Sequence, residues 1–451
     1  MILPSARPWF YRTAALLVFI VAQVLVLLVP MKMHEPGDWG FKYAARNFSH
    51  GHITLTVDQY LEQSQEVWDA GGWLLSYANT GEGRWAFTPA PGYVLYLAPF
   101  ESMGIPQAGA SLLSLGLIAV LYLLIARIKD EKTALFGVIL LVFTPLYLAM
   151  WQRVYMDALA SLAFCGMGGG LYLYYWLSRD RLSKRMSVLL LLASGLLLAV
   201  GALVRYPNIA IVAVFIGHFL VMAVRFHLRR EQFWPTGLFF GLGVALPLLG
   251  LLVYQGVVFG APFNTGGEFA QLPVRFVWHH DWGMGYSIIR SNIVQLWVPL
   301  IIALPVILAA IPSFAAVAHG KFFPRRTDSW PEIPAHLYHL LWGWIAAVFI
   351  LYVMYEWTAY QQGGQMPFTI LTRFYLPALL PLVIVTALML QRLLPSVRRS
   401  ILVLLTVLGV IFFIQVTMIS VPFDSGAMPP SLNWPVWPDD AFAGSLKELG
   451  L

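Results

Sequence analysis

The stretch PMKMHEPGDWGFKYAARNFSHG, residues 30–51, directly follows the first long apolar run, and the rest of the chain is organised around it. Asp38 stands a few residues past the end of that run. After it, apolar residues recur at helical spacing until Gly51, at Phe41, Ala44, Ala45 and Phe48. We therefore predict a short amphipathic helix on the bilayer surface with a carboxylate at its start. Asp38 either caps this helix, as Asp often does, or has a chemical role.

The composition is that of a polytopic membrane protein. The chain has 451 residues, of which 59% are apolar and 11% charged, whereas soluble domains carry about 25% charged residues. The single cysteine, Cys165, excludes a disulfide framework and argues against redox or zinc chemistry. The first apolar run ends at Pro30 without a small-residue cleavage site, so we interpret it as a retained span.

We expect an all-α fold with about eleven transmembrane helices, since each span needs about 20 mostly apolar residues. The candidate spans start near residues 13, 106, 134, 158, 188, 208, 235, 293, 338, 371 and 400. The long first extracytoplasmic loop, about 31–105, is expected to carry surface helices. Within it, the segments around Asn79-Thr80-Gly81 predict a hairpin. We assign residues 1–420 to one transmembrane catalytic domain and 421–451 to an extracytoplasmic tail.

The basic residues orient these spans. With the N-terminus in the cytoplasm, the cytoplasmic segments hold 18 of the 28 Lys and Arg residues but only 6 of the 22 acids. The flipped topology would place the basic clusters outside, so we reject it. The long polar segments then gather on the outer face, as an enzyme with one surface cavity requires.

Two other classes of protein stay open as alternatives. A transporter or flippase for lipid-linked sugars would place polar residues near the midplane, whereas the spans here are almost wholly apolar. His218 is an exception, which we interpret as a hydrogen bond between helices. A non-catalytic subunit that binds lipid-linked sugars would tolerate the loss of Asp38.

Several outer segments, taken in order, resemble the GT-C superfamily of integral membrane glycosyltransferases, which includes protein O-mannosyltransferases and the lipid A aminoarabinose transferase. The resemblance covers about residues 13–385. Its segments are Asp38 to Gly51, Thr88 to Pro99, Arg153 to Asp157, Gly195 to Asn208, Phe259 to Gly266, and Arg373 to Pro377. Many family members have paired acids where this chain has Asp38 alone.

The resemblance implies a reaction and its partners. The donor would be a polyprenyl-phosphate-linked sugar, the acceptor an extracytoplasmic protein, lipid or glycan, and the transfer inverting. Such a reaction needs one base for the acceptor hydroxyl and positive charge at the leaving phosphate. No cofactor is expected; a divalent metal is an alternative that the sequence does not support, and no nucleic acid is involved.

Asp38 is our candidate base, because a helix start favours an ionised carboxylate. Asp157 is the second catalytic candidate, and its alternatives are a helix cap or a salt bridge to Arg153. Arg205 and Arg373 stand at the outer ends of spans and are candidates to bind the lipid phosphate. A snorkelling arginine is the alternative for both.

Further basic residues of the outer loops are weaker candidates for the phosphate: Arg84, Lys42, Arg46 and Arg275. Their alternative is ordinary solvated charge. His279, His280 and Asp281 form a polar cluster, but adjacent side chains on an extended chain point apart, so no ready-made metal site is expected. We expect a prokaryotic plasma membrane location, with the active site on the outer face.

Overall fold

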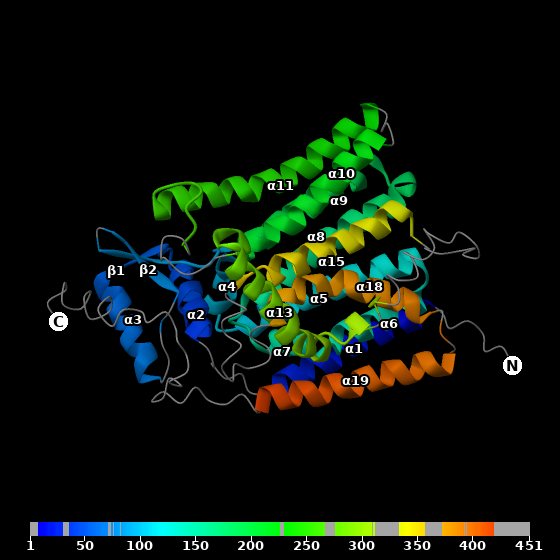
Figure 1. Ribbon diagram of the computed structural model, residues 1–451, viewed down its shortest axis with the longest axis horizontal. Coiled ribbons are helices and arrows are strands. Elements are labelled where there is room, and N and C mark those ends of the chain that lie inside the picture. Colours follow the sequence, from blue (N-terminus) through cyan, green and yellow to red (C-terminus); the bar gives the residue numbers. More distant parts are fainter. Residues whose placement is uncertain are drawn as a thin grey trace.

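The computed structural model describes residues 8–29, 36–70, 74, 76–81, 83–225, 230–266, 276–308, 310–311, 333–356, 372–391, 393 and 395–418. Long helices run side by side along the longest axis of the molecule (Figure 1). Short helices and strands of the first loop cover one end of this bundle, and the N-terminus lies at the opposite end. We call these the loop end and the opposite end.

The bundle contains a helix at or close to each of the eleven expected span starts. Among the described residues, eight helices are long and apolar enough to cross a membrane, or nine if a bent pair forms one span. The expected count of eleven is therefore not confirmed; α8 and α13 are the helices outside these candidates. The bundle helices are α1 (Pro8–Leu28), α5 (Pro106–Ile128), α6 (Glu131–Val142), α7 (Pro145–Gln152), α8 (Asp157–Ser178), α9 (Lys184–Val204), α10 (Ile209–Arg225), α11 (Arg230–Phe259), α13 (Trp282–Ala303), α15 (Ala335–Val353), α18 (Leu379–Leu390) and α19 (Pro395–Met418).

The bent pair is α6 and α7, which meet at an angle of 62°. Pro145 opens α7 and cannot donate a backbone hydrogen bond to α6, so the helix breaks before it. The Thr144 hydroxyl donates to the Leu140 carbonyl at 2.6 Å and satisfies one of the freed acceptors. All of α7 is buried, and it leads directly to the loop that precedes α8. Short 3-10 helices join other elements in the described residues, namely η1 (Arg179–Arg181), η2 (Tyr206–Asn208), η3 (Val277–His279) and η5 (Arg373–Ala378).

The first loop folds into a small cap with helices α2 (Pro36–Ser49), α3 (Val57–Asp69) and α4 (Gly92–Ser102). Strands β1 (Thr54–Thr56), β2 (Tyr77–Gly81) and β3 (Arg84–Phe87) form an antiparallel sheet in the order β1-β3-β2. The β2–β3 hairpin confirms the prediction. Its turn was placed too early, however, because Asn79–Gly81 belong to β2 itself, where the register shifts.

The predicted amphipathic helix is α2, but protein rather than lipid covers its apolar face. Phe41 is 6% exposed, Ala44 and Ala45 are fully buried, and the Phe41 ring lies 5.1 Å from that of Phe87 on β3. The helix also packs along α4. The sequence pattern shows that one face of the helix is buried away from water, but it does not show whether lipid or protein covers that face. After the helix, Gly51 adopts a φ of +79°, which glycine accepts without a steric penalty.

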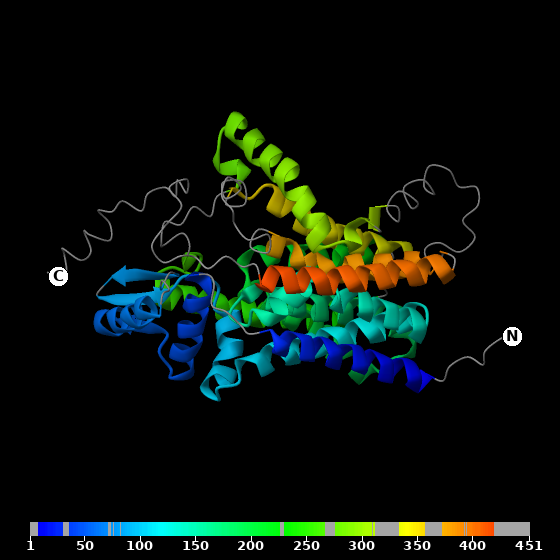
Figure 2. The same cartoon turned by 90° about the horizontal axis from the view of Figure 1, so that it is seen from below.

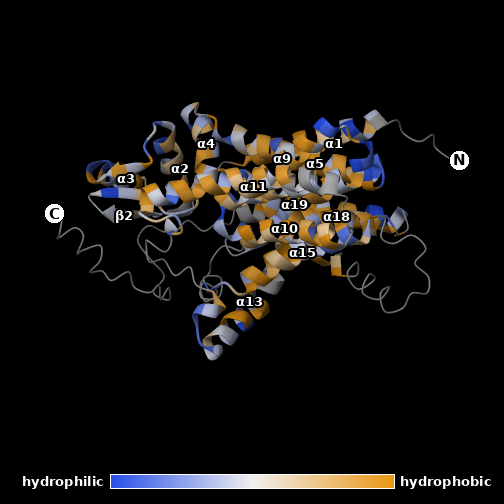
Figure 3. Cartoon of the chain, turned by 90° about the horizontal axis from the view of Figure 1, so that it is seen from above, coloured by the Kyte–Doolittle hydropathy of each residue, from blue (hydrophilic) through white to orange (hydrophobic). Residues whose placement is uncertain are grey.

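Hydrophilic residues gather at the two ends of the bundle, and apolar residues cover its length (Figure 3). At the opposite end, Arg12 of α1 pairs with Glu131 of α6, and Arg127 donates to the Ser178 hydroxyl. Within the bundle, His218 lies 3.0 Å from the Tyr172 hydroxyl and 3.1 Å from His336, which confirms the expected contact between helices. Seen from below, α13 projects sideways from the other helices (Figure 2).

Candidate active site

Five consecutive residues, Arg153–Asp157, connect the surrounding segments at the loop end of the bundle. They run from the end of α7 to the first residue of α8. Each of the five contacts a residue distant in sequence, and we call this segment the hub. Its partners are Asp38 for Arg153, Tyr93 for Val154, Glu101 for Tyr155, Arg373 for Met156 and Arg205 for Asp157. The hub therefore brings together α2, α4, the end of α9 and η5.

Asp38 and Arg153 form the first ion pair of the hub. Arg153 Nη2 lies 2.8 Å from Asp38 Oδ2, and the two side chains are 9% and 4% exposed. Because α2 begins at Pro36, Asp38 lies within its first turn rather than at the cap position. Asp38 is thus a buried carboxylate whose charge a guanidinium and a helix N-terminus both stabilise.

Asp157 and Arg205 form the second pair. Arg205 Nε donates to Asp157 Oδ2 at 3.0 Å, and Arg205 Nη2 donates to Asp157 Oδ1. Asp157 is the first residue of α8 and its side chain makes no cap, so the helix-cap alternative is wrong. The ion pair that it forms is with Arg205. Arg205 ends α9, and its side chain is only 8% exposed, so it is not a snorkelling residue.

Arg373 lies next to the second pair. Its Nη1 is 3.3 Å from the Met156 sulfur, and its guanidinium carbon is 5.2 Å from the centre of the Phe374 ring. The guanidinium carbon of Arg205 is 4.9 Å from the same ring. One aromatic ring therefore contacts both guanidiniums, so the two candidate phosphate-binding arginines share the Phe374 ring.

Tyr93 of α4 bonds to the middle of the hub. Its hydroxyl donates to the Val154 carbonyl, and the ring is fully buried. Burial raises the pKa of Tyr93 most, and the neighbouring Tyr96, Asp157, Tyr155 and Asp38 add to the rise. Asp38 and Asp157 are thus both anchored within the same five-residue segment, Asp38 through Arg153 and Asp157 as a member of it.

At two glycines the backbone of one segment lies against another, which packs further segments of the family resemblance against this site. A Cβ on Gly92 would lie 2.6 Å from the Leu203 carbonyl carbon, just before Arg205. A Cβ on Gly266 would lie 2.3 Å from the Thr88 carbonyl oxygen. Only glycine fits at either place, so the Thr88–Pro99 segment packs between the end of α9 and the Phe259–Gly266 segment.

Comparison with known proteins places this arrangement in a known fold. Residues 98–250 match the family model described as dolichyl-phosphate-mannose-protein mannosyltransferase. The crystal structure of ArnT from Cupriavidus metallidurans bound to undecaprenyl phosphate superposes with a TM-score of 0.50 at 16% identity, covering 92% of this chain and 72% of that one. The chain therefore has the fold of this ArnT structure.

A second solved structure shares this fold. The oligosaccharyltransferase of Archaeoglobus fulgidus in its apo form superposes with a TM-score of 0.57 at 12% identity, covering 92% of this chain and 57% of that one. The chain thus spans little more than half of the archaeal protein. A search of curated protein sequences gave no match.

The remaining basic residues expected at the phosphate site contact other side chains or are exposed. Arg46 is exposed and pairs with Glu66 of α3 at 3.7 Å. Lys42 lies over the Trp39 ring, and Arg84 is exposed on β3. None of these contacts involves the hub, and Arg275 lies outside the described residues. Their role at the phosphate stays a prediction.

The three side chains of the polar cluster at residues 279–281 each bond to a different partner. His279 Nδ1 accepts from the Phe276 backbone, His280 Nε2 lies 2.8 Å from Glu356 Oε2, and Asp281 caps α13. The side chains point to different partners, as expected, although His279 ends the short helix η3 and only His280 and Asp281 have extended backbone. In the part of the chain that the structure describes, no group of three His, Cys, Asp or Glu side chains could hold a metal ion.

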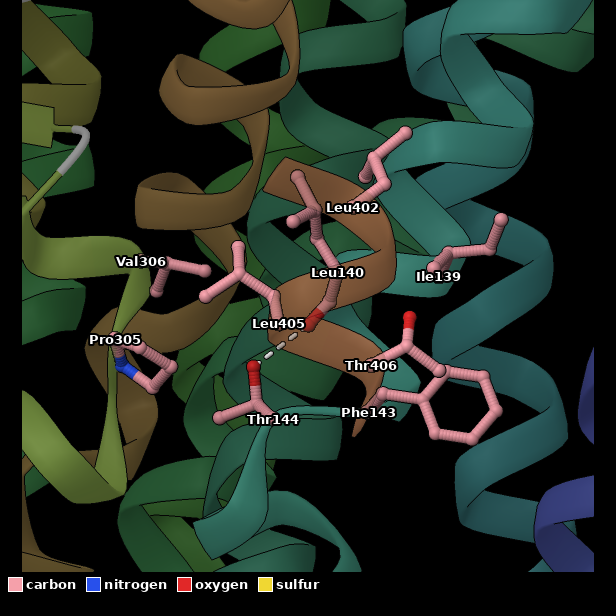
Figure 4. A pocket seen from close by; sticks show the side chains of 9 residues that line it. All are labelled: Ile139, Leu140, Phe143, Thr144, Pro305, Val306, Leu402, Leu405 and Thr406. Carbon is pink, nitrogen blue, oxygen red and sulfur yellow. Dashed lines mark hydrogen bonds between the residues drawn. The ribbon is translucent and has the colours of Figure 1, made fainter. Parts of the chain in front are cut away.

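A small crevice at the bend between α6 and α7 is a different kind of site. Its walls are mostly apolar, and the Thr144 hydroxyl turns away to the Leu140 carbonyl (Figure 4). No charged side chain lines it, so it offers no group for acid–base chemistry or phosphate binding. The lining residues are Ile139, Leu140, Phe143, Thr144, Pro305, Val306, Leu402, Leu405 and Thr406.

Sequence reasoning missed the residues that complete the candidate site. It treated Arg153 only as a possible partner of Asp157. Tyr93 and Phe374 lay within the segments Thr88 to Pro99 and Arg373 to Pro377 but had no role of their own. The order Arg-Val-Tyr-Met-Asp contained the signal, because a short loop between two buried helices has few ways to satisfy two charges.

Proposed function

We propose that this GT-C protein transfers a sugar from a polyprenyl-phosphate donor to an extracytoplasmic acceptor, with inversion and with Asp38 as the general base. The observation that carries the proposal is the pair of buried Asp–Arg contacts at one hub. A membrane protein buries ionised side chains only at a cost, and such groups mark functional sites.

The two pairs contain what the two substrates need. A carboxylate can accept the proton of an acceptor hydroxyl, and a guanidinium can bind a phosphate through two parallel hydrogen bonds. Asp38 supplies the base, and Asp157 positions the acceptor or replaces the base. Arg205 and Arg373 stabilise the charge that develops on the leaving phosphate. Lys42, Arg46, Arg84 and Arg275 are further candidates on the donor path.

Arg153 couples the donor to the base. While it pairs with Asp38, it stabilises the carboxylate and weakens it as a base. A phosphate that arrives at the hub competes for the guanidinium, so Asp38 becomes more basic once the donor is bound. The acceptor proton is then removed only in the ternary complex, which limits loss of the donor to water.

The donor class is supported by relatives. ArnT from Cupriavidus metallidurans was crystallised with undecaprenyl phosphate, and the matched family is described by its dolichyl-phosphate-mannose donor. We place the protein in a prokaryotic plasma membrane, with a cytoplasmic N-terminus and the hub at the outer face. This orientation follows from the excess of Lys and Arg in the segments of the opposite end.

Release of free polyprenyl phosphate tests the proposal. The purified protein would be incubated with a panel of radiolabelled polyprenyl-phosphate sugars, with and without extracted cell-envelope acceptors, and donor binding would be measured in parallel. We expect release from at least one donor, with the label moving to the acceptor. Donor binding without any release, across all acceptors, would instead support a flippase or a binding subunit.

A further inference from the structure

Arg398 of α19 is a buried arginine that no carboxylate neutralises. Three arginines of the described residues are buried, namely Arg153, Arg205 and Arg398. The first two belong to the ion pairs of the hub, whereas no acid in the part of the chain that the structure describes pairs with Arg398. Its Nη1 donates to the neutral Gln391 side chain at 2.6 Å, and its Nε has no hydrogen-bond partner among the described residues. The guanidinium therefore keeps its charge and spare donors for an anion.

The place of Arg398 in the fold adds to this uncompensated charge. It lies in the first turn of α19, which begins at the opposite end of the bundle (Figure 1). That turn contains no acid, and the exposed Arg399 follows directly. The two acids at the start of α6 have other partners, because Asp130 caps α6 and Glu131 pairs with Arg12. A helix N-terminus is itself positive, so an anion is favourable at this place.

An apolar crevice continues from Arg398 along the contact between α19 and α6, which we call the α6–α19 seam. The Arg398 guanidinium carbon lies 5.0 Å from the centre of the Phe136 ring on α6. On α19, the same face carries Leu402, Leu405 and Thr406, at four, seven and eight residues after Arg398. These three residues line the crevice at the α6–α7 bend (Figure 4). At 1.5 Å per residue, the crevice runs from about 6 Å to about 12 Å beyond the charge.

We propose that the α6–α19 seam binds an anionic phospholipid, with the lipid phosphate at Arg398 and one acyl chain along the crevice. The lipid belongs to the leaflet at the opposite end of the bundle, which is the cytoplasmic leaflet in the proposed orientation. The seam and the hub lie at different ends of the molecule, and the inference does not depend on the proposed function.

The chemistry of the seam fits such a lipid. A guanidinium binds phosphate oxygens through parallel hydrogen bonds, and a helix N-terminus adds to the attraction. Basic pockets between transmembrane helices at the cytoplasmic side bind the head groups of anionic lipids in this way. The rest of α19 exposes apolar side chains such as Val403 and Leu404, against which further acyl chains can lie. A soluble anion such as inorganic phosphate would use the charge but not the apolar crevice.

Lipid binding by the purified full-length protein tests the inference. The delipidated protein in detergent would be titrated with phosphatidylglycerol, phosphatidylcholine, inorganic phosphate and glycerophosphoglycerol, which is the phosphatidylglycerol head group without acyl chains. Native mass spectrometry measures the bound lipid, and the melting temperature measures the stabilisation that binding produces. We expect phosphatidylglycerol to bind more tightly than the other three compounds and to raise the melting temperature.

Arg398→Gln should weaken phosphatidylglycerol binding by about tenfold or more, because it removes charge-assisted hydrogen bonds at a buried position. The matched control is Arg399→Gln, which removes an exposed charge from the next residue and should change binding only slightly. Equal losses in the two variants would indicate general attraction to a basic surface and would overturn the site. Lipid-free Arg398→Gln should be at least as stable as wild type, since a buried charge without a counter-ion is unfavourable. A lower melting temperature would mean that the protein itself neutralises Arg398, which would also overturn the site.

Thr406→Phe tests the acyl chain, because the larger side chain would fill the crevice. It should weaken phosphatidylglycerol binding by about tenfold, since it displaces methylene groups from apolar contact. Val407→Phe is the matched control, at an exposed position of the same turn outside the crevice, and should leave binding unchanged. Equal losses in these two variants, or equal stabilisation by inorganic phosphate, would refute a lipid in the crevice. Equally tight binding of phosphatidylcholine would refute the preference for an anionic head group.

Discussion

The two ends of the bundle treat their charged residues differently. At the loop end, Asp38–Arg153 and Asp157–Arg205 are buried, with no side chain of the four more than 15% exposed. At the opposite end, Arg12 pairs with Glu131 while its own side chain stays 66% exposed. Exposed pairs add little to stability, whereas buried pairs carry a desolvation cost that only good geometry offsets. Stability alone therefore does not explain the buried charges at the loop end, and a functional role does.

The largest effect on stability is expected from Asp157→Ala. It leaves Arg205 buried without its carboxylate, which costs about 3–5 kcal/mol. The free energy of unfolding in detergent, from a denaturant titration, measures this cost. The double variant Asp157→Leu/Arg205→Met removes both charges and should recover most of the loss. If the single variant is as stable as wild type, the buried ion pairs of the loop end contribute no more to stability than the exposed pair at the opposite end.

Arg153→Lys should lower turnover by about tenfold, a loss of roughly 1.4 kcal/mol of transition-state stabilisation. Lysine keeps the charge but lacks the planar fork that can serve both Asp38 and a phosphate. Steady-state kinetics with the active donor measure the loss, and a melting temperature close to that of wild type excludes misfolding. Unchanged turnover would refute the coupling of donor to base through Arg153.

Tyr93→Phe tests how firmly the hub is held. The variant loses the hydroxyl that donates to the Val154 carbonyl, and a neutral hydrogen bond of this kind contributes about 1 kcal/mol. Denaturant titration should show a loss of that size. A loss as large as that of Asp157→Ala would mean that the Tyr93 hydroxyl also stabilises the ion pairs of the hub.

Arg12→Ala should have the smallest effect. The exposed pair with Glu131 is screened by water and salt, so neither the melting temperature nor turnover should change measurably. A shift comparable to that of Asp157→Ala would remove the distinction between the two ends.

Much of the fold could be predicted from the sequence, because the length of each apolar run and the helical spacing of its residues determine local structure. Helices occur at the expected span starts, and α2 spans the predicted stretch with Asp38 in its first turn. The covering of α2 by α4 and β3 did not follow, since an amphipathic pattern does not distinguish lipid from protein. The number of membrane spans also could not be predicted. It depends on whether α8 and α13 cross the membrane, and their composition does not answer that question.

The candidate site was predicted as a set of residues but not as pairs. Asp38, Asp157, Arg205 and Arg373 lie together at the hub, whereas Arg46 and Arg84 lie apart from it. Which arginine pairs with which carboxylate depends on how α2, α4 and α9 pack. Sequence spacing does not reveal contacts between residues that are 48 and 115 positions apart.

Turnover of Asp38→Asn tests the central claim most directly. Asparagine keeps the shape of the side chain but cannot accept the acceptor proton, so general-base catalysis of about 10²–10⁴-fold should be lost. The account predicts that release of polyprenyl phosphate falls by this factor while donor binding remains. Normal turnover in Asp38→Asn would contradict it, and would reduce the buried Asp38–Arg153 pair to a structural contact.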